Sequence, residues 1–422
     1  MLRKADAWVF SSALALAVPT ADVSAQTWEV FDMTSAGLPS NNVTDIVEDS
    51  QGVIWAATEW GLCRYDGSTW SVYQEGSSGI PGNVVRALAV DSLDRIWIGT
   101  QLFGVVVFDG TDWVTYDTEN SGLPENEINS LAIDHRGWAW IGTYLGLACF
   151  TGDEWRVYNT SDTAYGGLQF NGNTILHTAV REDGLVAVGT LNGGFHYLTD
   201  TSLVVHATYI DMFPDNTQNE TAFDPLTNER WLATPSQGLL RQGGHWWDGP
   251  WFQYTTGNST IPSNAVTCLR VDGQSRVWVG TLLGGVGVRE TDGAFVNYTS
   301  SNSGLPDNTV QCLLIATDGS IWVGTASGGL ARLTFAEGLS DAPEQDAAIY
   351  PNPCPGRLTL ELPWKDGGEW YLFGSQGTLT RRGVLPEAAR TTLDLTGLDA
   401  GVYTLAVPAG SRSLTWKVIL LP

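Results

Sequence analysis

Most of this chain consists of apolar stretches of four to seven residues that are separated by short polar reversals. The unit from Gly79 to Tyr116 shows the order, with apolar stretches at 84–90, 95–99, 105–108 and 113–116. A turn containing Gly and Pro precedes the first stretch, and Asp109-Gly110 separates the last two. Stretches of this length bounded by turn residues are typical of β-strands, and Asp-Gly between two of them is a strong hairpin signal. The pattern predicts four short strands joined by tight turns.

One phrase within this pattern occurs seven times: an apolar residue, Trp, another apolar residue, Gly or Ala, and Thr, with Ala187 in place of Trp in the fourth copy and Arg230 as the first residue of the fifth. It occurs as IWAAT at Trp55, IWIGT at Trp97, AWIGT at Trp140, VAVGT at Ala187, RWLAT at Trp231, VWVGT at Trp278 and IWVGT at Trp322. The intervals are 42, 43, 47, 44, 47 and 44 residues. A period of about 40–45 residues with several strands per unit is the signature of a β-propeller. We therefore predict an all-β chain with a seven-bladed propeller over residues 26–336.

The two ends of this region complement each other. After the seventh Trp strand the chain reaches the stretch 329–335 without a fourth strand, whereas Trp28 to Phe31 near the other end matches the fourth-strand pattern. A strand supplied from the opposite end would close the ring and leave no open sheet edge. We predict that Trp28–Phe31 completes the last blade.

Two further positions recur at fixed places in the repeat. An Asn stands 14 residues before the Trp position in six units, as Asn41, Asn83, Asn126, Asn173, Asn264 and Asn308. We expect each to hydrogen-bond its own turn, and most of the repeated aromatic residues to pack between blades. The segments 159–173, 200–223 and 242–251 depart from the repeat, and irregular loops on a rigid scaffold often carry function.

The first 25 residues have the pattern of a secretory signal peptide. Arg3 and Lys4 precede an apolar run from Ala7 to Val18, and Val23-Ser24-Ala25 forms a small-residue cleavage site. The run is too short to span a bilayer, and nothing later approaches the roughly 20 apolar residues that a span needs. We expect a mature chain that begins at Gln26, has no transmembrane segment and leaves the cytoplasm.

Charge is distributed unevenly along the chain. Residues 26–347 contain 38 Asp and Glu, 12 Arg and no Lys, and an acidic linker at 337–347 separates them from the nearly neutral residues 348–422. A strongly negative surface repels phosphate backbones and anionic membranes. This excludes nucleic acid as an expected partner and disfavours polyanionic glycans.

The sequence contains no recognisable catalytic, metal or cofactor motif. The five histidines are scattered, and the five cysteines lack metal-ligand spacing. Cys268 and Cys312 occupy equivalent repeat positions, so a disulfide is an alternative to the preferred interpretation that the cysteines are small buried strand residues. We expect no metal and no cofactor, and an enzyme is less favoured than a binding protein.

The repeat unit resembles that of the two-component regulator propeller. The residues that carry the resemblance run from Gly122 to Tyr158 in the order GLPxN, D-x-x-G-x-x-W-x-G-T, G-L and W-x-x-Y, and the other blades carry part of it. In that family such repeats often form the sensor of membrane-bound hybrid histidine kinases that detect polysaccharide fragments. This chain contains no kinase and no response regulator segment, so the resemblance implies the recognition module alone.

The C-terminal residues 348–422 resemble the sorting domain of type IX secretion substrates. The matching positions are Tyr350, Pro351, Asn352 and Pro353, a central Gly-rich turn, Gly401 and Tyr403 of a late strand, and Lys417 of the last strand. Cys354 departs from the family, which usually has a small polar residue there. The resemblance implies an Ig-like β-sandwich that is recognised by the type IX secretion machinery, and a secreted or outer-membrane surface protein that passes through the periplasm. The alternative is a generic adhesion module.

A propeller of this topology places the turns after each Thr and the GLPxN turns on one face. In blades one to three these turns present the candidate ligand-binding residues Glu59, Trp60, Gln101, Phe103 and Tyr144. Exposed aromatic rings beside carboxylate and amide groups suit sugars, which stack on rings while their hydroxyls take hydrogen bonds. We expect a non-catalytic glycan-binding protein. The alternatives are a protein-binding surface scaffold or adhesin, and a propeller-type lyase or hydrolase.

Overall fold

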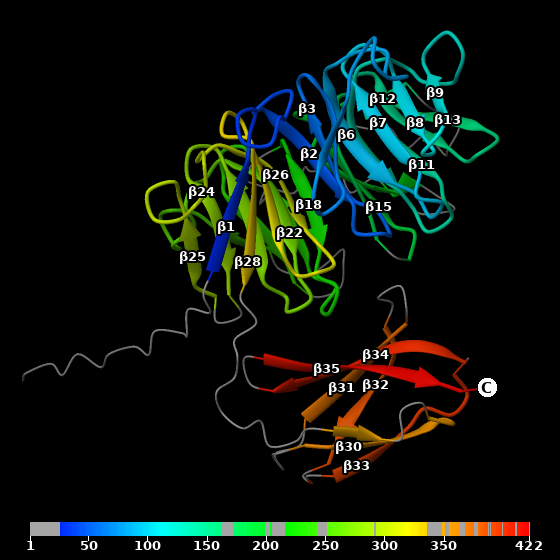
Figure 1. Cartoon of the computed structure of the whole chain (residues 1–422), viewed down its shortest axis with the longest axis vertical. Coiled ribbons are helices and arrows are strands. Elements are labelled where there is room, and N and C mark those ends of the chain that lie inside the picture. Colours follow the sequence, from blue (N-terminus) through cyan, green and yellow to red (C-terminus); the bar gives the residue numbers. More distant parts are fainter. Residues whose placement is uncertain are drawn as a thin grey trace, which may run out of the picture.

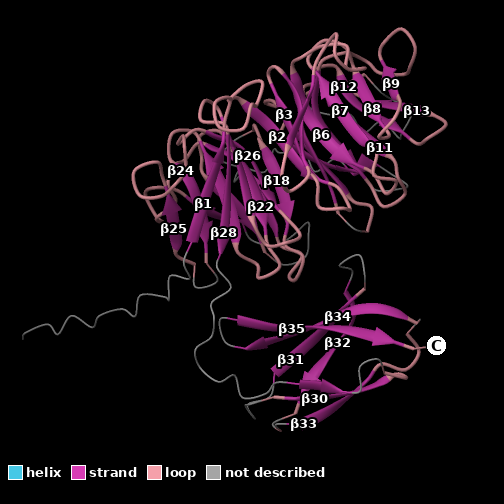
Figure 2. Cartoon of the chain, in the orientation of Figure 1, coloured by secondary structure: helices cyan, strands magenta, loops and turns pink. Residues whose placement is uncertain are grey.

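The computed structural model describes residues 26–161, 172–181, 183–198, 203–204, 216–243, 251–290, 293–335, 348–350, 354–362, 368–374, 379–386, 388, 390–398, 400–409 and 412–421. Throughout these residues the secondary structure is β-strand, and no helix occurs (Figure 2). Strands β1–β28 gather in one body and β29–β35 in a second (Figure 1). The predicted signal peptide and the linker 337–347 lie outside the described residues.

The first body contains seven four-stranded antiparallel sheets, which we number as blades 1 to 7. Blades 1 to 3 are β2(Val43–Glu48), β3(Ile54–Thr58), β4(Gly61–Tyr65), β5(Trp70–Tyr73); β6(Val85–Val90), β7(Ile96–Thr100), β8(Val105–Phe108), β9(Trp113–Tyr116); and β10(Ile128–Ile133), β11(Ala139–Thr143), β12(Gly146–Phe150), β13(Trp155–Tyr158). Blades 4 and 5 are β14(Ile175–Val180), β15(Val186–Thr190), β16(Phe195–Leu198), β17(Leu203–Val204); and β18(Glu220–Phe223), β19(Arg230–Ala233), β20(Leu239–Gln242), β21(Trp251–Tyr254). Blades 6 and 7 are β22(Val266–Val271), β23(Val277–Thr281), β24(Gly285–Arg289), β25(Phe295–Tyr298); and β26(Val310–Ile315), β27(Ile321–Thr325), β28(Leu330–Phe335), β1(Gln26–Phe31). The all-β propeller predicted from the repeat is confirmed.

The first strands of the blades lie side by side around the axis, with β26 next to β2. The ring closes as predicted, because β1 pairs with β28 along its whole length, from Gln26 opposite Phe335 to Phe31 opposite Leu330. Phe31 is buried and stacks on Trp322 of blade 7, with 5.5 Å between ring centroids. It also contacts Tyr65 and Trp70 of blade 1, so one side chain joins the last blade to the first.

The recurring Asp-x-x-Gly-x-x-Trp order has a direct structural cause. In four blades the indole Nε1 donates to the aspartate six residues earlier, at 3.1 Å for Trp55 and Asp49 and at 3.0 Å for Trp97 and Asp91. The same pair forms in blades 3 and 6. The aspartate also accepts N–H groups of its own hairpin, such as those of Leu93 and Arg95. One carboxylate therefore satisfies both the turn and a buried indole.

The repeated Asn connects each crossover turn to the preceding strand. In five blades its Oδ1 accepts the backbone N–H of the residue eight positions earlier, at 2.8 Å for Met33 and Asn41 and at 2.8 Å for Glu75 and Asn83. Asn173 accepts the N–H of Thr160, thirteen positions earlier. We expected this Asn to bond its own turn, and the partner instead lies near the start of the crossover.

Trp28 of the closing strand β1 packs against Gly304, where an added Cβ would lie 2.3 Å from the Cβ of Trp28. A side chain at Gly304 would displace the closing strand.

The second body has a three-stranded and a four-stranded antiparallel sheet. The strands are β29(Ala348–Tyr350), β30(Arg357–Glu361) and β33(Arg390–Asp394), and β31(Gly368–Phe373), β32(Leu379–Leu385), β34(Gly401–Ala409) and β35(Arg412–Leu420). Leu360 of the first sheet and Leu372 and Leu405 of the second belong to one buried cluster, so the two sheets share a core. The Ig-like topology stays a prediction.

The five cysteines are buried free thiols in the structure. Cys268 and Cys312 lie in the first strands of adjacent blades, and each sulfur packs against a glycine of its own blade, Gly280 and Gly324 respectively. Burial raises the pKa of Cys63, Cys149 and Cys268 to about 12. These properties match small apolar strand residues, which was the preferred interpretation of the sequence.

Candidate functional site

The crossover turns and the turns between the second and third strands lie on one face of the propeller. The N–H of Gly104 in the β7–β8 turn donates to the carbonyl of Asn126 in the crossover to blade 3, at 2.9 Å. Gly285 and Asn308 make the same bond between blades 6 and 7, also at 2.9 Å. We call this surface the turn face, and the opposite surface, which carries the hairpins after the first and third strands, the hairpin face.

All five candidate ligand-binding residues lie in turns of the turn face. Glu59 and Trp60 lie in the β3–β4 turn, Gln101 and Phe103 in the β7–β8 turn and Tyr144 in the β11–β12 turn. The exposed fractions of the aromatic residues are 59% for Trp60, 42% for Phe103 and 37% for Tyr144. Glu59 is exposed and Gln101 is half-buried. Consecutive blades thus present three aromatic side chains on the same face.

The Thr that ends each second strand holds these turns rigidly. The Oγ1 of Thr58 accepts the N–H of Trp60 at 3.1 Å and donates to the carbonyl of Gly61 at 2.7 Å. Thr100 clamps Phe103 and Gly104 in the same way, at 2.9 Å for both bonds. Because the hydroxyl is fully buried, the backbone under each aromatic residue is fixed.

The crossovers support the same turns from the side. The Nε2 of Gln74, in the crossover from blade 1, donates to the carbonyl of Trp60 at 2.7 Å. The ring of Phe103 packs on Gly82, where an added Cβ would lie 2.4 Å from the ring. Glu125 bonds the backbone of Tyr144, although burial and the charge of Glu127 raise the pKa of Glu125. The turns and crossovers of blades 1 to 3 therefore form one continuous surface.

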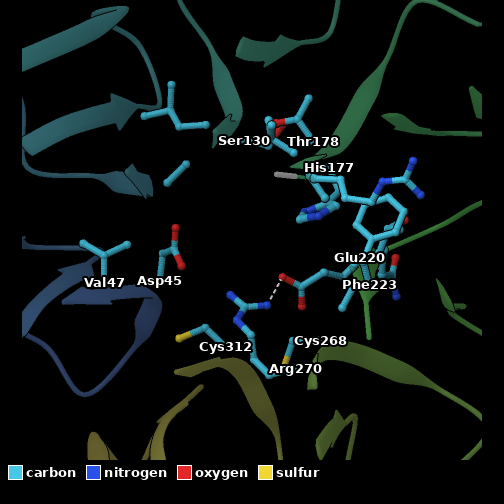
Figure 3. A pocket seen from close by; sticks show the side chains of 18 of the residues that line it. Asp45, Val47, Ser130, His177, Thr178, Glu220, Phe223, Cys268, Arg270 and Cys312 are labelled. Atoms are coloured by element: carbon cyan, nitrogen blue, oxygen red, sulfur yellow. Dashed lines mark hydrogen bonds and ion pairs between the residues drawn. The ribbon is translucent and has the colours of Figure 1, made fainter. Parts of the chain in front are cut away.

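A second candidate site lies along the axis, where a cavity of about 1290 Å³ is lined by the first strands. The residues of equivalent position in these strands are Asp45, Ala87, Ser130, His177, Glu220, Cys268 and Cys312. Figure 3 shows Asp45, His177, Glu220 and Arg270 directed toward one another across this space. The five candidate residues of the turn face do not line the described wall of the cavity.

Several polar side chains that line this channel donate to the next blade. Thr44 donates to the carbonyl of Val85 at 2.7 Å, and Thr267 makes the corresponding bond to Val310 at 2.6 Å. The amides of Asn129 and Asn219 bond the carbonyls of Ile175 and Val266 at 2.9 and 2.8 Å. These hydrogen bonds join neighbouring blades, so these four residues have a structural role.

In the same channel, the ion pair of Glu220 and Arg270 and the carboxylate of Asp45 form a charged cluster. Glu220 accepts the N–H of Leu269 at 2.7 Å and pairs with the guanidinium of Arg270. Desolvation opposes the charge of Arg270, but Glu220 and then Asp45 outweigh it, so the pKa of Arg270 is raised. Burial lowers the pKa of His177, and the charge of Glu220 only partly opposes this effect. The lowered pKa favours the neutral imidazole at pH 7.

Asp45 should make stability depend on pH in an unusual direction. Desolvation raises the pKa of Asp45 to about 6, although its bond from the N–H of Leu88 and the charge of Arg270 lower it. The folded protein therefore binds this proton more tightly than the unfolded chain. The contribution of Asp45 to stability is fully present below the ordinary pKa of 3.8 and is lost as pH rises through about 6.

The measurement is urea unfolding of the wild-type protein and of Asp45→Asn between about pH 3 and pH 8. We expect the difference in unfolding free energy, wild type minus variant, to fall as pH rises from 4 to 7. The other titrating groups are the same in both proteins, so their contributions to the unfolding free energy cancel in this difference. A difference that stays constant, or that rises with pH, would contradict the assigned direction.

The channel cluster was not among the residues expected from the sequence. Asp45, His177 and Glu220 occupy the equivalent position of their first strands, where the other blades have Ala, Ser or Cys. Aligning the seven first strands would have shown three ionisable residues at a position that otherwise holds small residues. That signal indicates an unusual ring, although the partner of each charge does not follow from it.

The sorting positions are described only in part. Gly401 begins β34, Tyr403 is buried in the core of the second body, and Lys417 lies opposite Thr404 in the β34–β35 pair. Tyr350 ends β29, whereas Pro351, Asn352 and Pro353 lie outside the described residues. Cys354 is buried and bridges to Leu420. The tail core therefore joins its first and last segments.

Within the described ranges, no helix is long and apolar enough to cross a membrane. No group of three or more His, Cys, Asp or Glu side chains in these ranges is arranged to hold a metal ion. The described histidines are spread over separate places: His135 in a hairpin of blade 3, His177 in the channel and His196 buried in β16. Trp246 and Trp247 of the irregular segment 242–251 lie outside the described residues.

Solved structures with the same fold come from several functional settings. PorZ, described as an essential bacterial surface component of the type-IX secretion system of Porphyromonas gingivalis, is 18% identical with a TM-score of 0.57, and the match covers 93% of this chain and 60% of PorZ. The extracellular domain of the putative hybrid two component system BT3049 from B. thetaiotaomicron is 19% identical with a TM-score of 0.60, covering 94% and 55% of the two chains. Virginiamycin B lyase from Staphylococcus aureus is 12% identical with a TM-score of 0.58, covering 74% and 99%.

These likenesses establish the propeller fold, and the chain spans about 60% of the length of PorZ and about 55% of that of BT3049. A search of the curated proteins gives no match. The family model described as "Two component regulator propeller" matches this chain at residues 37–60, 79–101, 122–145, 260–282 and 304–327. The family model described as "Secretion system C-terminal sorting domain" matches it at residues 348–421. The sorting match links the chain to secretion and to a secreted or cell-surface location. The chain thus carries two-component regulator propeller repeats followed by a type IX secretion C-terminal sorting domain.

Proposed function

We propose that this protein is a non-catalytic binding protein, secreted or held at the cell surface, whose propeller recognises a glycan. The supporting observation is the row of exposed aromatic residues, Trp60, Phe103 and Tyr144, on three consecutive turns of the turn face. Aromatic rings stack on the apolar faces of sugars, while neighbouring polar groups bond the hydroxyls. Glu59 and Gln101 supply a carboxylate and an amide in the same turns.

The rigidity of these turns favours binding. A buried Thr hydroxyl accepts the backbone N–H of Trp60 and of Phe103, and in the turn of Tyr144 it accepts the N–H of the next residue, Leu145. Because these turns are held in place, little conformational entropy is lost when a ligand docks. The sorting domain would deliver this surface to the outside through the periplasm and the type IX secretion machinery. The glycan-detecting role often associated with such repeats in sensor proteins agrees with this assignment.

The testable prediction is a double substitution, Trp60→Ala with Tyr144→Ala. Screening the full-length protein on a glycan array should first identify a bound glycan, and the double variant should lose that binding by at least about tenfold, since a truncated aromatic anchor costs more than about 1 kcal/mol. Both side chains are exposed, so the melting temperature should change little. Leu282→Ala, on blade 6 of the same face, is the matched control.

Two results would contradict the proposal. Retained affinity in the double variant would move the site away from these turns, and an array without any hit would contradict glycan binding.

A second candidate function, a scaffold for protein partners, is favoured by Leu283, which is 75% exposed and has a positive φ of 66°. An exposed apolar side chain on a strained backbone is typical of a contact residue. Loss of a protein partner, with no loss of glycan, on Leu283→Gly would support that function.

A further inference from the structure

The sector of the turn face that carries the aromatic residues is also its most acidic sector. Glu59 adjoins Trp60, Glu75 adjoins the Gln74 that bonds the Trp60 carbonyl, and Glu119 lies in the crossover that leads to blade 3. All three glutamates are exposed. The crossovers from blade 5 to blade 6 and from blade 6 to blade 7 contain no charged residue except Asp307. The carboxylate of Asp307 accepts a hydrogen bond from the hydroxyl of Ser327. Negative charge and aromatic surface therefore coincide in blades 1 to 3.

Positive charge is kept away from this sector. Residues 26–347 contain no Lys. Among the described turns and crossovers of the turn face there is no Arg either, and Arg86, which lines the channel, is paired with Glu127 at 3.5 Å. Arg95, Arg136 and Arg276 lie in hairpins of the hairpin face, each bound to an aspartate. A ligand that docks on the aromatic sector meets carboxylates that no arginine neutralises.

We propose that the turn face of blades 1 to 3 selects a glycan bearing free amino groups, with Trp60, Phe103 and Tyr144 stacking on the sugar rings and Glu59, Glu75 and Glu119 facing the ammonium groups. This inference rests on the proposed glycan-binding function and names its ligand class. An ammonium group is attracted both to the face of an aromatic ring and to a carboxylate. A neutral sugar is attracted only to the aromatic rings, and a polyanionic sugar is repelled by the carboxylates.

A comparison with the exposed leucines of blade 6, on the same face, supports the choice of blades 1 to 3. Leu282 and Leu283 of blade 6 are 47% and 75% exposed, but their turn and both flanking crossovers carry no exposed glutamate. An apolar surface alone attracts any apolar partner, whereas aromatic rings combined with carboxylates discriminate by charge. Blades 1 to 3 combine the two properties, and blade 6 has only one of them.

The experiment compares three β-1,4-linked hexasaccharides of equal length by calorimetry with the full-length protein at low ionic strength. They are a glucosamine hexamer with free amines, its fully N-acetylated form and a glucose hexamer. We expect the free-amine hexamer to bind at least about tenfold more tightly than the other two, from combined cation–π and ion-pair contributions. Raising the ionic strength to about 1 M, where the Debye length is about 3 Å, should bring its affinity toward theirs.

Variants separate the two parts of the surface. The double change Glu75→Gln with Glu119→Gln should remove much of the preference for the amine and leave the weaker binding of the neutral hexamers. Trp60→Ala with Tyr144→Ala should weaken all three ligands. Asp153→Asn with Glu154→Gln, which removes two exposed carboxylates of the hairpin face, should change none of them and controls for net charge.

Each alternative outcome has a distinct meaning. Equal binding of the three hexamers overturns the amine preference and leaves the glycan function standing. Absence of binding to all three, with another glycan bound on the array, also overturns the inference alone, whereas a blank array removes the proposed function as well. If an oligolysine of the same charge competes as strongly as the amino sugar, the surface recognises basic peptides and the glycan assignment is overturned.

Discussion

Deletion of Gln26–Phe31 should strongly destabilise the propeller. This segment is β1, the outer strand of blade 7, and its removal exposes the edge of β28 over its full length. It also removes Phe31, which contacts Trp322 in blade 7 and Tyr65 and Trp70 in blade 1. Burial of one such aromatic contributes roughly 1.5–3 kcal/mol, against a total stability of about 5–15 kcal/mol for a folded domain. Calorimetry should show a large fall in the melting temperature, or aggregation through the open edge.

A graded series makes this prediction precise. Phe31→Ala alone should cost about 3–5 kcal/mol, because the cavity left between the first and last blades cannot collapse easily. Glu29→Gln, an exposed change on the same strand, should have almost no effect. If the deletion variant melts like the intact protein, the ring must close in another way.

Deletion of residues 348–422 should retain a folded propeller inside the cell envelope. These residues match the secretion sorting domain, so their removal takes away the segment that we expect the export machinery to recognise. The buried cluster of the tail runs from Cys354 to Leu420 and shares no residue with the described clusters of the propeller. The propeller should therefore keep its melting temperature while its location changes.

Cell fractionation with an antibody to the propeller measures this effect. The truncated protein is expected in the periplasm and the intact protein at the surface or in the medium. Thr392→Ser, an exposed change on β33, is the control and should be exported normally. Full export of the truncated chain would show that the tail is dispensable for sorting.

The strands themselves could be predicted because the interactions that form them are local. The predicted stretches 105–108 and 113–116 coincide with β8 and β9, since Asp109 closes the hairpin between them by accepting the N–H groups of Thr111 and Asp112. The closing strand could be predicted for a related reason: a blade without its fourth strand leaves an edge that only Trp28–Phe31 matches. The turn face follows from strand order, so the places of Trp60 and Tyr144 also follow from sequence.

The sequence by itself determined the repeat, the four strands of each regular blade, the residues of the aromatic turns and the sorting motif, because each depends on contacts within about one repeat length or on a local signature. The tertiary structure alone decided the channel cluster. Asp45 of blade 1 acts on Arg270 of blade 6, and Glu220 binds a residue 50 positions away. The sequence does not show which of these three charges lie close together. Only closure of the ring brings them into one desolvated space, where their pairing and their pKa shifts arise.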